Sequence, residues 1–427
     1  MLHIRVFREQ ADLIRADHDK RSLPHDAIDE VIRLDEAWRA ARHEADLGRR
    51  KRNEAAKGIA AAKKAGDEEA FASIRAEVDS ISVGIEQQVA AANGFEEERD
   101  KLRMRIPNLL HAEVPVGADE HENTLHSLHS AKPDLSFEPK NHNELIESNR
   151  WVDLARAAKI TGSRFYFLKG DLARLDLALQ QYAIEFLRVR GYTFVQPPMM
   201  MNRTAYEGVT DLADFETVMY GIEPDGFYAI ATSEHPLTAM FMDEVIEPSQ
   251  LPLKMAGISP CFRREVGAHG LSDKGIWRVH QFTKVEQIII AKPEDSWQLH
   301  EELLTNCIDL WNSLKIHYRV VNICSGDMGT VAARKYDLEA WLPGVGEYKE
   351  IVSCSNCTDY QANRLRMRYR TSDGNEAVHT LNSTAAATSR ALVVILEQYQ
   401  NEDHSVNIPE VLQPLMGGQT VLESCNW

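Results

Sequence analysis

The sequence lacks the features that would assign a chain of this length to a membrane or secreted class. Among its 427 residues, no apolar run approaches the roughly 18 needed to span a bilayer. Residues 1–21 contain no apolar stretch of signal-peptide length. The six cysteines are scattered from Cys261 to Cys425, which argues against a disulfide framework. We therefore expect a soluble, cytoplasmic protein with reduced thiols and no membrane partner.

Common nucleotide-binding signatures and an excess of basic charge are also missing. The sequence has no G-x-x-x-x-G-K-[ST] phosphate loop, and Gly344-x-Gly346 lacks the third glycine and the strand of a dinucleotide site. The net charge of −17 by itself argues against a nucleic-acid-binding protein. The charge is uneven, however, because residues 49–64 carry seven basic residues against one acidic residue, a balance of +6.

The hydrophobic share of 44% is sufficient for a packed core, and the length predicts two or three domains. The first is a helical arm, residues 1–112. Apolar and small residues recur at alternating steps of three and four over residues 31–62 and 71–106, with breaks at Ala65-Gly66-Asp67 and Pro107. This heptad pattern is typical of two helices, each roughly 50 Å long, that pair as an antiparallel coiled-coil hairpin and project from the protein.

Basic residues gather in the half of this hairpin that lies near its turn. Arg50, Lys57 and Lys64 are seven residues apart, on the face opposite the heptad seam. A run of charges on a helix is usually a solvated face. The alternative is a stripe that contacts phosphates.

A polar connector, residues 113–163, follows the arm. Its three histidines show no metal-ligand spacing. We expect residues 164–427 to form one globular domain. It would open with a strand over residues 164–170, an amphipathic helix over 172–190 and a strand over 191–197.

The most informative stretch of this domain is residues 262–286. Period-2 alternation at both ends predicts two antiparallel strands, joined by the glycine-containing segment 267–276. Two guanidinium groups, two carboxylates and an aromatic ring would share one face, which is therefore either a solvated face or a binding site and not a core. These residues are Arg263, Glu265, Arg278, Phe282 and Glu286.

Three further motifs carry candidate site residues. Thr232-Ser233-Glu234 follows a predicted strand and is either a helix cap or a substrate contact. Residues 348–357 contain a C-x-x-C pair, but no second pair at zinc-finger spacing accompanies it, which argues against a metal role. Residues 381–397 predict a small-residue turn leading into a buried helix, with Arg390 at its mouth, where a guanidinium needs a partner such as a phosphate.

Together these motifs resemble the class II aminoacyl-tRNA synthetases. Residues 262–286 resemble the second signature motif of that class, and the RVHQFTKVE half, residues 278–286, is similar to that of the seryl-tRNA synthetases. Residues 172–197 resemble the first motif. Residues 381–397 resemble the third, although three of its usual glycines are replaced. Neither HIGH nor KMSKS, the class I signatures, occurs.

The resemblance implies an α+β fold, with an N-terminal antiparallel coiled-coil hairpin and a catalytic domain built on an antiparallel β-sheet flanked by helices. It implies ATP-dependent activation of L-serine to seryl-adenylate and transfer of serine to the 3′ end of tRNA-Ser, with tRNA-Sec as a further acceptor. The implied partners are ATP with Mg²⁺, L-serine, tRNA and a second copy of the chain in a homodimer formed through the first motif. No DNA partner is expected.

The resemblance also implies roles for individual residues. Arg263 would hold the α-phosphate and Arg278 and Arg390 the outer phosphates, so these three arginines are the implied catalytic residues. Glu265 would accept from the adenine amine, and Phe282 would stack on the ring. The whole implied ATP-binding set is Arg263, Arg264, Glu265, Arg278, Val279, Phe282, Glu350, Ile351, Val352, Ser353 and Arg390, of which Glu350 and Ser353 would hold the magnesium ion.

The substrate-binding residues are implied in the same way. Serine needs a carboxylate for its ammonium group and partners for its hydroxyl. The implied serine-binding residues are Thr232, Ser233, Glu234, Arg263, Glu286, Asn382 and Thr384. The arm would grip tRNA by backbone and shape. The implied tRNA-binding residues are Arg49, Arg50, Arg52, Lys57 and Lys64.

Three alternatives remain open at this point. An amino acid:carrier-protein ligase would share the catalytic fold but would not need a basic, projecting arm. A non-enzymatic coiled-coil interaction protein with a synthetase-like domain would not be expected to keep all the motif arginines and carboxylates. A class II synthetase for threonine or proline would share the core, but the Thr-Ser-Glu triplet, the RVHQF sequence and the hairpin favour serine.

Overall fold

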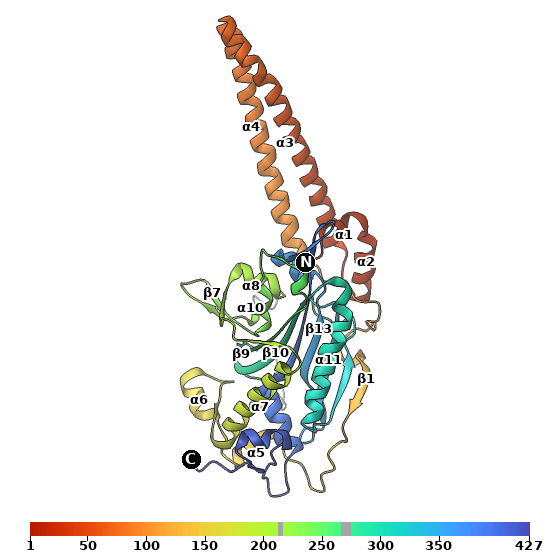
Figure 1. The fold of residues 1–427 in the computed structure, drawn as a ribbon, viewed down its shortest axis with the longest axis vertical. Coiled ribbons are helices and arrows are strands. Elements are labelled where there is room, and N and C mark those ends of the chain that lie inside the picture. The colour runs from red at the N-terminus through yellow and green to blue at the C-terminus, as the bar shows by residue number, and fades with distance from the viewer. Residues whose placement is uncertain (212–216, 266–274) are drawn as a thin grey trace. The chain divides into compact units, whose positions relative to one another are not determined.

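The computed structural model describes residues 1–211, 217–265 and 275–427. These residues divide into two compact units, Leu2–Ile106 and Pro107–Trp427, the second of which also includes Met1. In Figure 1 the first unit is coloured red to orange, and the second runs through yellow and green to blue. Within the described residues, no helix is long and apolar enough to cross a membrane.

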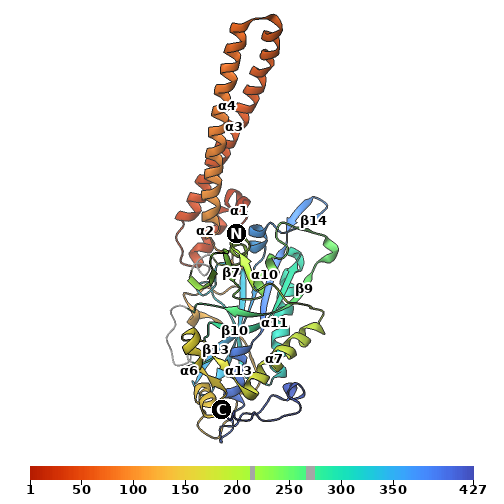
Figure 2. The ribbon, with the colours of Figure 1, turned by 90° about the vertical axis from the view of Figure 1, so that its left-hand side faces the viewer.

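The smaller unit contains the predicted hairpin. Its helices are α1 (Ile4–Glu9), α2 (Ala11–Lys20), α3 (Asp26–Ala65) and α4 (Glu68–Arg103). α3 and α4 lie side by side and antiparallel along their length (Figures 1 and 2). Gly66 ends α3 at φ 70°, a left-handed conformation that glycine adopts without strain. The Asp67 side chain then caps α4 by accepting from the Ala70 amide at 2.9 Å. The predicted antiparallel hairpin is therefore confirmed.

Small residues on the seam allow the two helices to approach closely. A Cβ atom added at Gly48 would lie 2.7 Å from Cγ1 of Ile85, and one at Gly58 would lie 3.0 Å from Cδ1 of Ile74. A larger residue at Gly48 would therefore force a neighbour to move. The spacing also identifies Gly48 and Ile85 as facing positions near the middle of the hairpin.

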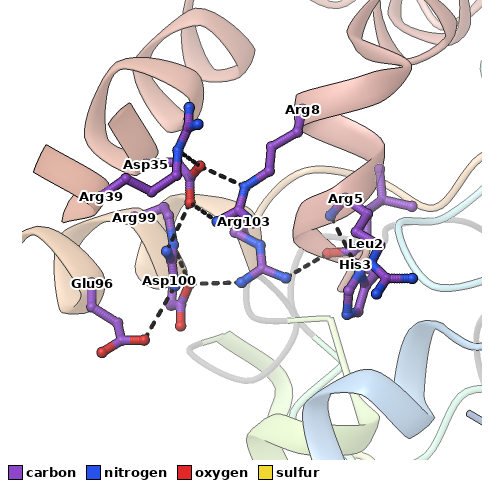
Figure 3. Close-up of polar contacts among 10 residues, drawn as sticks. All are labelled: Leu2, His3, Arg5, Arg8, Asp35, Arg39, Glu96, Arg99, Asp100 and Arg103. Carbon is purple, nitrogen blue, oxygen red and sulfur yellow. Dashed lines mark hydrogen bonds and ion pairs between the residues drawn. The ribbon is translucent and has the colours of Figure 1, made fainter. Parts of the chain in front are cut away.

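A buried network of ion pairs fastens α1 to both long helices, as Figure 3 shows. Asp35 of α3 accepts from Arg8 of α1 at 2.7 and 2.8 Å, from Arg99 of α4 at 3.0 Å and lies 3.2 Å from Arg39. Burial, which raises the pKa of Asp35, is outweighed by the hydrogen bond and charge of Arg8 and by the other two arginines, so this pKa lies below its usual value. Asp35 therefore remains ionised and links three helices.

The larger unit is built on an eight-stranded sheet with the strand order β1-β11-β12-β13-β16-β10-β9-β4. Every neighbouring pair is antiparallel except β4 with β9. Its strands are β1 (Thr124–His129), β4 (Thr193–Val195), β9 (Leu253–Phe262), β10 (Gln281–Ala291), β11 (Tyr318–Asn322), β12 (Arg334–Leu342), β13 (Glu347–Asn356) and β16 (His379–Ala387). The predicted α+β fold on an antiparallel sheet is confirmed.

Helices cover both faces of this sheet, which explains the apolar run Ile288-Ile289-Ile290 on β10. Ile289 packs in one core with residues of α7 (Gly170–Arg188), α11 (Ser296–Ser313) and α13 (Thr388–Gln398). Ile288 and Ile290 pack in a second core with residues of α8 (Arg203–Val209), α10 (Glu234–Ala239) and α12 (Tyr360–Leu365). Successive side chains on a strand point to opposite faces, so a strand covered on both sides is apolar throughout.

Shorter elements complete the described part of this unit. Two short helices, α5 (His142–Ser148) and α6 (Leu154–Thr161), precede α7. The strands of the smaller sheets are β2 (Val152–Asp153), β3 (Phe167–Leu168), β5 (Met200–Asn202), β6 (Gly221–Ile222), β7 (Phe227–Ala229), β8 (Val245–Ile246), β14 (Arg368–Thr371) and β15 (Gly374–Ala377).

The hairpin predicted within residues 262–286 exists, but both strand boundaries were wrong. β9 ends at Phe262, which pairs with Gln281 at the start of β10, so Arg263, Glu265 and Arg278 lie beyond the ladder. Glu265 has φ 47°, a left-handed conformation in which a strand does not continue. Val266 and most of the predicted loop, residues 267–274, lie outside the described residues.

Three other segments also differ from the prediction. Of the strand expected over residues 164–170, only the two residues of β3 form a strand, and Gly170 already begins α7. The small-residue turn expected before Arg390 is the strand β16, whose Ser383, Ala385 and Ala387 stand where glycines were expected. The expected connector, residues 113–163, contributes β1 to the edge of the main sheet, where it pairs with β11. The larger unit begins at Pro107.

Candidate functional site

A pocket of about 490 Å³ is lined by residues of β10, β12, β13 and β16, of the starts of α10 and α13, and of the segment that follows β9. Ionisable side chains of both signs dominate its described walls. The basic ones are Arg263, Arg278, Lys284, Lys335 and Arg390, and the carboxylates are Glu234, Glu265, Glu286 and Glu350. This combination suits a ligand that carries phosphates together with a zwitterionic group.

Most of the residues expected at a site meet in this pocket. From the expected ATP set, the wall contains Arg263, Glu265, Arg278, Val279, Phe282, Glu350, Ile351, Ser353 and Arg390. From the expected serine set, it contains Thr232, Glu234, Arg263, Glu286, Asn382 and Thr384. Three expected residues are not part of the wall, namely Arg264, Val352 and Ser233. Their roles, like those of the lining residues, remain predictions.

The three residues outside the wall have other surroundings. Arg264 lies over the ring of Tyr220, with its guanidinium carbon 5.5 Å from the ring centroid. Val352 is buried in the apolar core of the sheet. Ser233 is buried next to Gly257, where a Cβ atom would lie 2.8 Å from its Oγ.

One end of the pocket gathers arginines around an aromatic ring. The guanidinium carbon of Arg263 lies 5.5 Å from the centroid of Phe282. Nε of Arg278 donates to Oε2 of Glu265 at 2.8 Å. Arg278 is predicted to contact phosphate, and Glu265 is predicted to contact the adenine amine. A bound nucleotide would therefore share or replace this ion pair. The region therefore offers phosphate-binding guanidinium groups close to a flat apolar surface.

Arg390, in the first turn of α13, also lines the pocket. Its Nη1 donates to the backbone oxygen of Glu350 at 2.7 Å and lies 3.4 Å from the Glu350 carboxylate. Its guanidinium carbon lies 5.3 Å from the centroid of Trp277. Arg390 therefore already has protein partners, and a phosphate would be an additional one.

Glu350 and Ser353 offer oxygen ligands of the kind that magnesium prefers. Burial, which raises the pKa of Glu350, is outweighed by the positive charges of Arg390, Lys335 and Arg263, so its pKa is lowered to about 2. The carboxylate therefore stays ionised at neutral pH. One carboxylate and one hydroxyl are too few for an all-protein cage but fit an ion that takes its other ligands from nucleotide phosphates and water.

The C-x-x-C pair has no comparable set of ligands around it. Cys354 and Cys357 are buried free thiols, and burial raises the pKa of both. The Cys357 sulfur accepts from Nδ2 of Asn382 at 3.6 Å. Over the described residues, no group of three or more His, Cys, Asp or Glu side chains is arranged to hold a metal ion.

The other end of the pocket contains a carboxylate fixed by two neighbours. Nζ of Lys284 lies 2.6 Å from Oε2 of Glu286, and the Thr384 hydroxyl donates to the same oxygen at 3.2 Å. Lys284 and Glu286 are two positions apart on β10 and therefore share a face. Glu286 is thus a carboxylate held in place through one of its two oxygens.

A second carboxylate, Glu234, accepts hydrogen bonds from two neutral side chains among the described residues. Its Oε1 accepts from Nε2 of Gln361 and from Nδ2 of Asn382, each at 3.1 Å. Burial, assisted by the charge of Glu286, raises the pKa of Glu234 to about 7. The Thr232 hydroxyl accepts from the Glu234 amide at 3.2 Å, so the triplet makes a helix-start contact and also lines the pocket.

Three ionisable residues of the described wall, Lys335, Lys284 and His235, were not predicted from the sequence. Lys335 pairs with Asp337 at 2.9 Å, and Lys284 pairs with Glu286. His235 follows Glu234, and burial, with Lys284 and Arg263, lowers its pKa to about 3. Lys284 could have been predicted from the sequence, because it lies two positions from both Phe282 and Glu286 and therefore on the same face of the strand.

The basic residues expected to contact tRNA lie on α3 in the smaller unit. Arg50, Lys57 and Lys64 are exposed, whereas Arg49 and Arg52 are partly buried. Arg49 is paired with Asp46 at 2.6 Å. The heptad spacing therefore places three exposed cations along one helix.

Comparison with family models divides the chain in a similar way. The model described as "Seryl-tRNA synthetase N-terminal domain" matches residues 1–110. The model described as "tRNA synthetase class II core domain (G, H, P, S and T)" matches residues 220–399. The second range contains the whole described pocket wall except Thr210, Val218 and Met219.

Individual proteins are similar over the whole chain. A serine--tRNA ligase of Methanocella arvoryzae is 51% identical over 426 residues, which cover 98% of this chain and 99% of the relative. The crystal structure of seryl-tRNA synthetase from Pyrococcus horikoshii complexed with ATP matches with a TM-score of 0.93 at 41% identity and covers 100% of both chains. The cytoplasmic serine-tRNA ligase of Naegleria fowleri in complex with AMP matches with a TM-score of 0.89 at 35% identity, covering 100% of this chain and 99% of that one.

Proposed function

The chain belongs to the seryl-tRNA synthetase family, and from this premise we propose that it activates L-serine with ATP and transfers the serine to the 3′ end of tRNA-Ser. The observation that carries the proposal is the pocket itself. Its wall combines three arginines, Arg263, Arg278 and Arg390, with two carboxylates that have different surroundings, Glu234 and Glu286. Such a pocket fits the two substrates of adenylate formation side by side.

Adenylate formation requires the serine carboxylate to attack the α-phosphorus of ATP in line with the departing pyrophosphate. Negative charge then develops on phosphate oxygens, so catalysis consists mainly of positioning and electrostatic stabilisation. We assign the α-phosphate to Arg263 and the outer phosphates to Arg278 and Arg390. Phe282 offers its ring to adenine, and Glu265 offers an acceptor to the adenine amine.

We assign the magnesium ion of the nucleotide to Glu350 and Ser353. When bound, the ion neutralises charge on the phosphate oxygens. The low pKa of Glu350 keeps its carboxylate available as a ligand at neutral pH. Arg390, 3.4 Å from this carboxylate, orients it in the free protein.

The two carboxylates suit different groups of serine. Glu286 is already compensated by Lys284 and therefore suits the neutral hydroxyl. Glu234 accepts from the neutral amides of Gln361 and Asn382 in the described part of the chain and therefore suits the ammonium group. Thr232, Asn382 and Thr384 complete the polar wall. A site that hydrogen-bonds a hydroxyl rejects alanine, because its own polar groups would be left unpaired.

The helical arm supplies the surface for tRNA. Its exposed cations, Arg50, Lys57 and Lys64, are spaced by two helical turns, so they can follow a phosphate backbone without reading bases. The net charge of −17 makes this local basic cluster more distinctive. tRNA-Sec would be gripped by the same means.

We also propose that the chain acts as a homodimer. Large apolar side chains are exposed along α7 and at β4, the edge strand of the main sheet. Leu177 is 63% exposed, Val189 63% and Phe194 41%. A second copy of the chain would cover them.

The experiment that tests the function is charging of tRNA-Ser with radiolabelled amino acids in the presence of ATP and magnesium. We expect serine to be attached, and attachment to disappear when the terminal diol of the tRNA has been oxidised with periodate. Failure to charge intact tRNA-Ser, or charging with a different amino acid, would contradict the proposal.

A further inference from the structure

We propose that Lys284 is a positioning residue for serine recognition, which holds the Glu286 carboxylate so that its second oxygen is always presented to the substrate hydroxyl as an acceptor. This inference rests on the proposed function and adds to it a residue that determines specificity. It follows from the geometry of the ion pair and from its burial. It also follows from the described contacts of Glu286, which all involve one carboxylate oxygen and leave the other available.

The ion pair is short and buried. Nζ of Lys284 lies 2.6 Å from Oε2 of Glu286, and the two side chains are 7% and 2% exposed. Both residues line the pocket, so the pair is part of the site and not a surface feature. A short charge-assisted contact between groups on one strand face fixes both side chains in a single arrangement.

The contacts of Glu286 are unevenly distributed over its two oxygens. Lys284 and Thr384 both bind Oε2. No hydrogen bond from a described residue reaches Oε1. A carboxylate oxygen inside a polar pocket needs a donor. The hydroxyl of the substrate is that donor.

Lys284 also determines which oxygen of Glu286 is left for the substrate. Among the described residues, Lys284 is the cation within 4.0 Å of Glu286. Its ammonium group can only donate, so Oε2 accepts in this contact, and Oε1 is left to accept from the substrate hydroxyl.

Lys284→Met tests this role, because it keeps the length of the side chain and removes the charge. In serine-dependent ATP–pyrophosphate exchange, we expect KM for serine to rise about tenfold or more with little change in kcat, because the hydroxyl contact is made in both ground and transition states. The preference for serine over alanine should fall by a similar factor, because alanine has no hydroxyl. Lys284→Arg should restore most of the preference.

The chain offers a matched control. Lys254 of β9 pairs with Glu302 at 2.7 Å, but neither residue lines the pocket. Lys254→Met removes a lysine–glutamate pair from the same sheet and should leave KM for serine unchanged. Binding of ATP and a cooperative thermal transition show that each variant is folded. Lys284→Gln replaces the methionine variant if that variant does not fold.

An unchanged KM in the folded Lys284 variant would overturn the inference. An equal loss with serine and alanine would also overturn it, because it would assign Lys284 a structural role only. Lys284→Met should have little further effect in a Glu286→Gln background, since both changes act on one interaction; additive losses would contradict this. Absence of serine-dependent exchange in the unaltered protein would refute the proposed function instead, and it is seen before any variant is made.

Discussion

Protonation of Glu234 should make serine binding depend on pH in the physiological range. Burial, with the charge of Glu286, raises its pKa from 4.5 to about 7, so in the free protein this carboxyl is mainly neutral below pH 7. Only the ionised form pairs with the serine ammonium group. Serine itself remains zwitterionic in this range. Affinity should therefore fall as the pH is lowered.

The size of the effect follows from a single titrating group. The apparent dissociation constant scales with the reciprocal of the ionised fraction of Glu234. It should therefore be about twofold above its limiting value at pH 7, about elevenfold above it at pH 6, and within about 10% of it at pH 8. Below pH 7, each bound serine should also release close to one proton, since binding requires the ionised carboxylate.

Calorimetry of serine binding without nucleotide is the suitable assay, because ATP and pyrophosphate titrate in the same range. Titrations in buffers with different ionisation enthalpies count the protons released. Glu234→Gln should bind more weakly and lose the pH dependence, whereas Glu265→Gln, which alters the pocket carboxylate that pairs with Arg278, should retain it. A constant affinity between pH 6 and 8 without proton release would refute the reasoning.

Other predictions concern the Glu286 carboxylate, the helical arm and the ion pairs of Asp35 that link α1, α3 and α4. Glu286→Ala should abolish serine activation while ATP binding persists; unchanged serine-dependent turnover would contradict the assignment. Replacing residues 49–84 with a short glycine turn should leave adenylate formation nearly intact and stop tRNA charging, and charging at the full rate would exclude the proposed role of the arm. Neutralising the three exposed cations of α3 should reduce the slope of log binding constant against log salt by roughly 0.7–0.9 for each phosphate that the variant no longer neutralises, and an unchanged slope would show that these cations bind no phosphate. Asp35→Ala should lower the free energy of unfolding by about 1.5–3 kcal/mol, because it removes the buried carboxylate that Arg8 and Arg99 share, while Arg99 keeps its contacts with Asp100 and Glu96. The exposed Asp12→Ala should have little effect on the same denaturation curves, and equal effects would refute the importance of the network.

The hairpin could be predicted from the sequence because its determinants are local. A heptad seam over residues 31–62 and 71–106 and a glycine between two helices specify α3, α4 and their antiparallel pairing without reference to the rest of the chain. Gly48 could be recognised as a small seam residue in the same way. The ion pairs of Asp35 with Arg8 and Arg99 could not, because they join residues 27 and 64 positions away.

Residues 262–286 show where the period-2 alternation of polar and apolar residues stops predicting a strand. Arg263 and Glu265 continue the period-2 pattern of β9 after the strand itself has ended. Both line the pocket, so their polar character reflects the pocket and not a continuing strand. The left-handed φ of Glu265 has no sequence signal, since glutamate is rarely found in that conformation.

The edge strand was missed for a different reason. β1 is polar and short, and its partner β11 lies almost 200 residues further along the chain, for example Thr124 opposite Asn322. A strand with one exposed edge and little apolar surface has no period-2 pattern to detect. Lys284, in contrast, stands within the most informative motif, and its importance depends on a 2.6 Å contact that only the structure shows.

The central claim is that this pocket activates serine and no other amino acid. The most direct test is amino-acid-dependent ATP–pyrophosphate exchange with the purified protein and magnesium, measured for each of the twenty amino acids. We expect exchange with serine alone. Exchange with another amino acid would contradict the assignment of Glu234 and Glu286, and no exchange with any amino acid, after a repeat with tRNA present, would contradict the catalytic function.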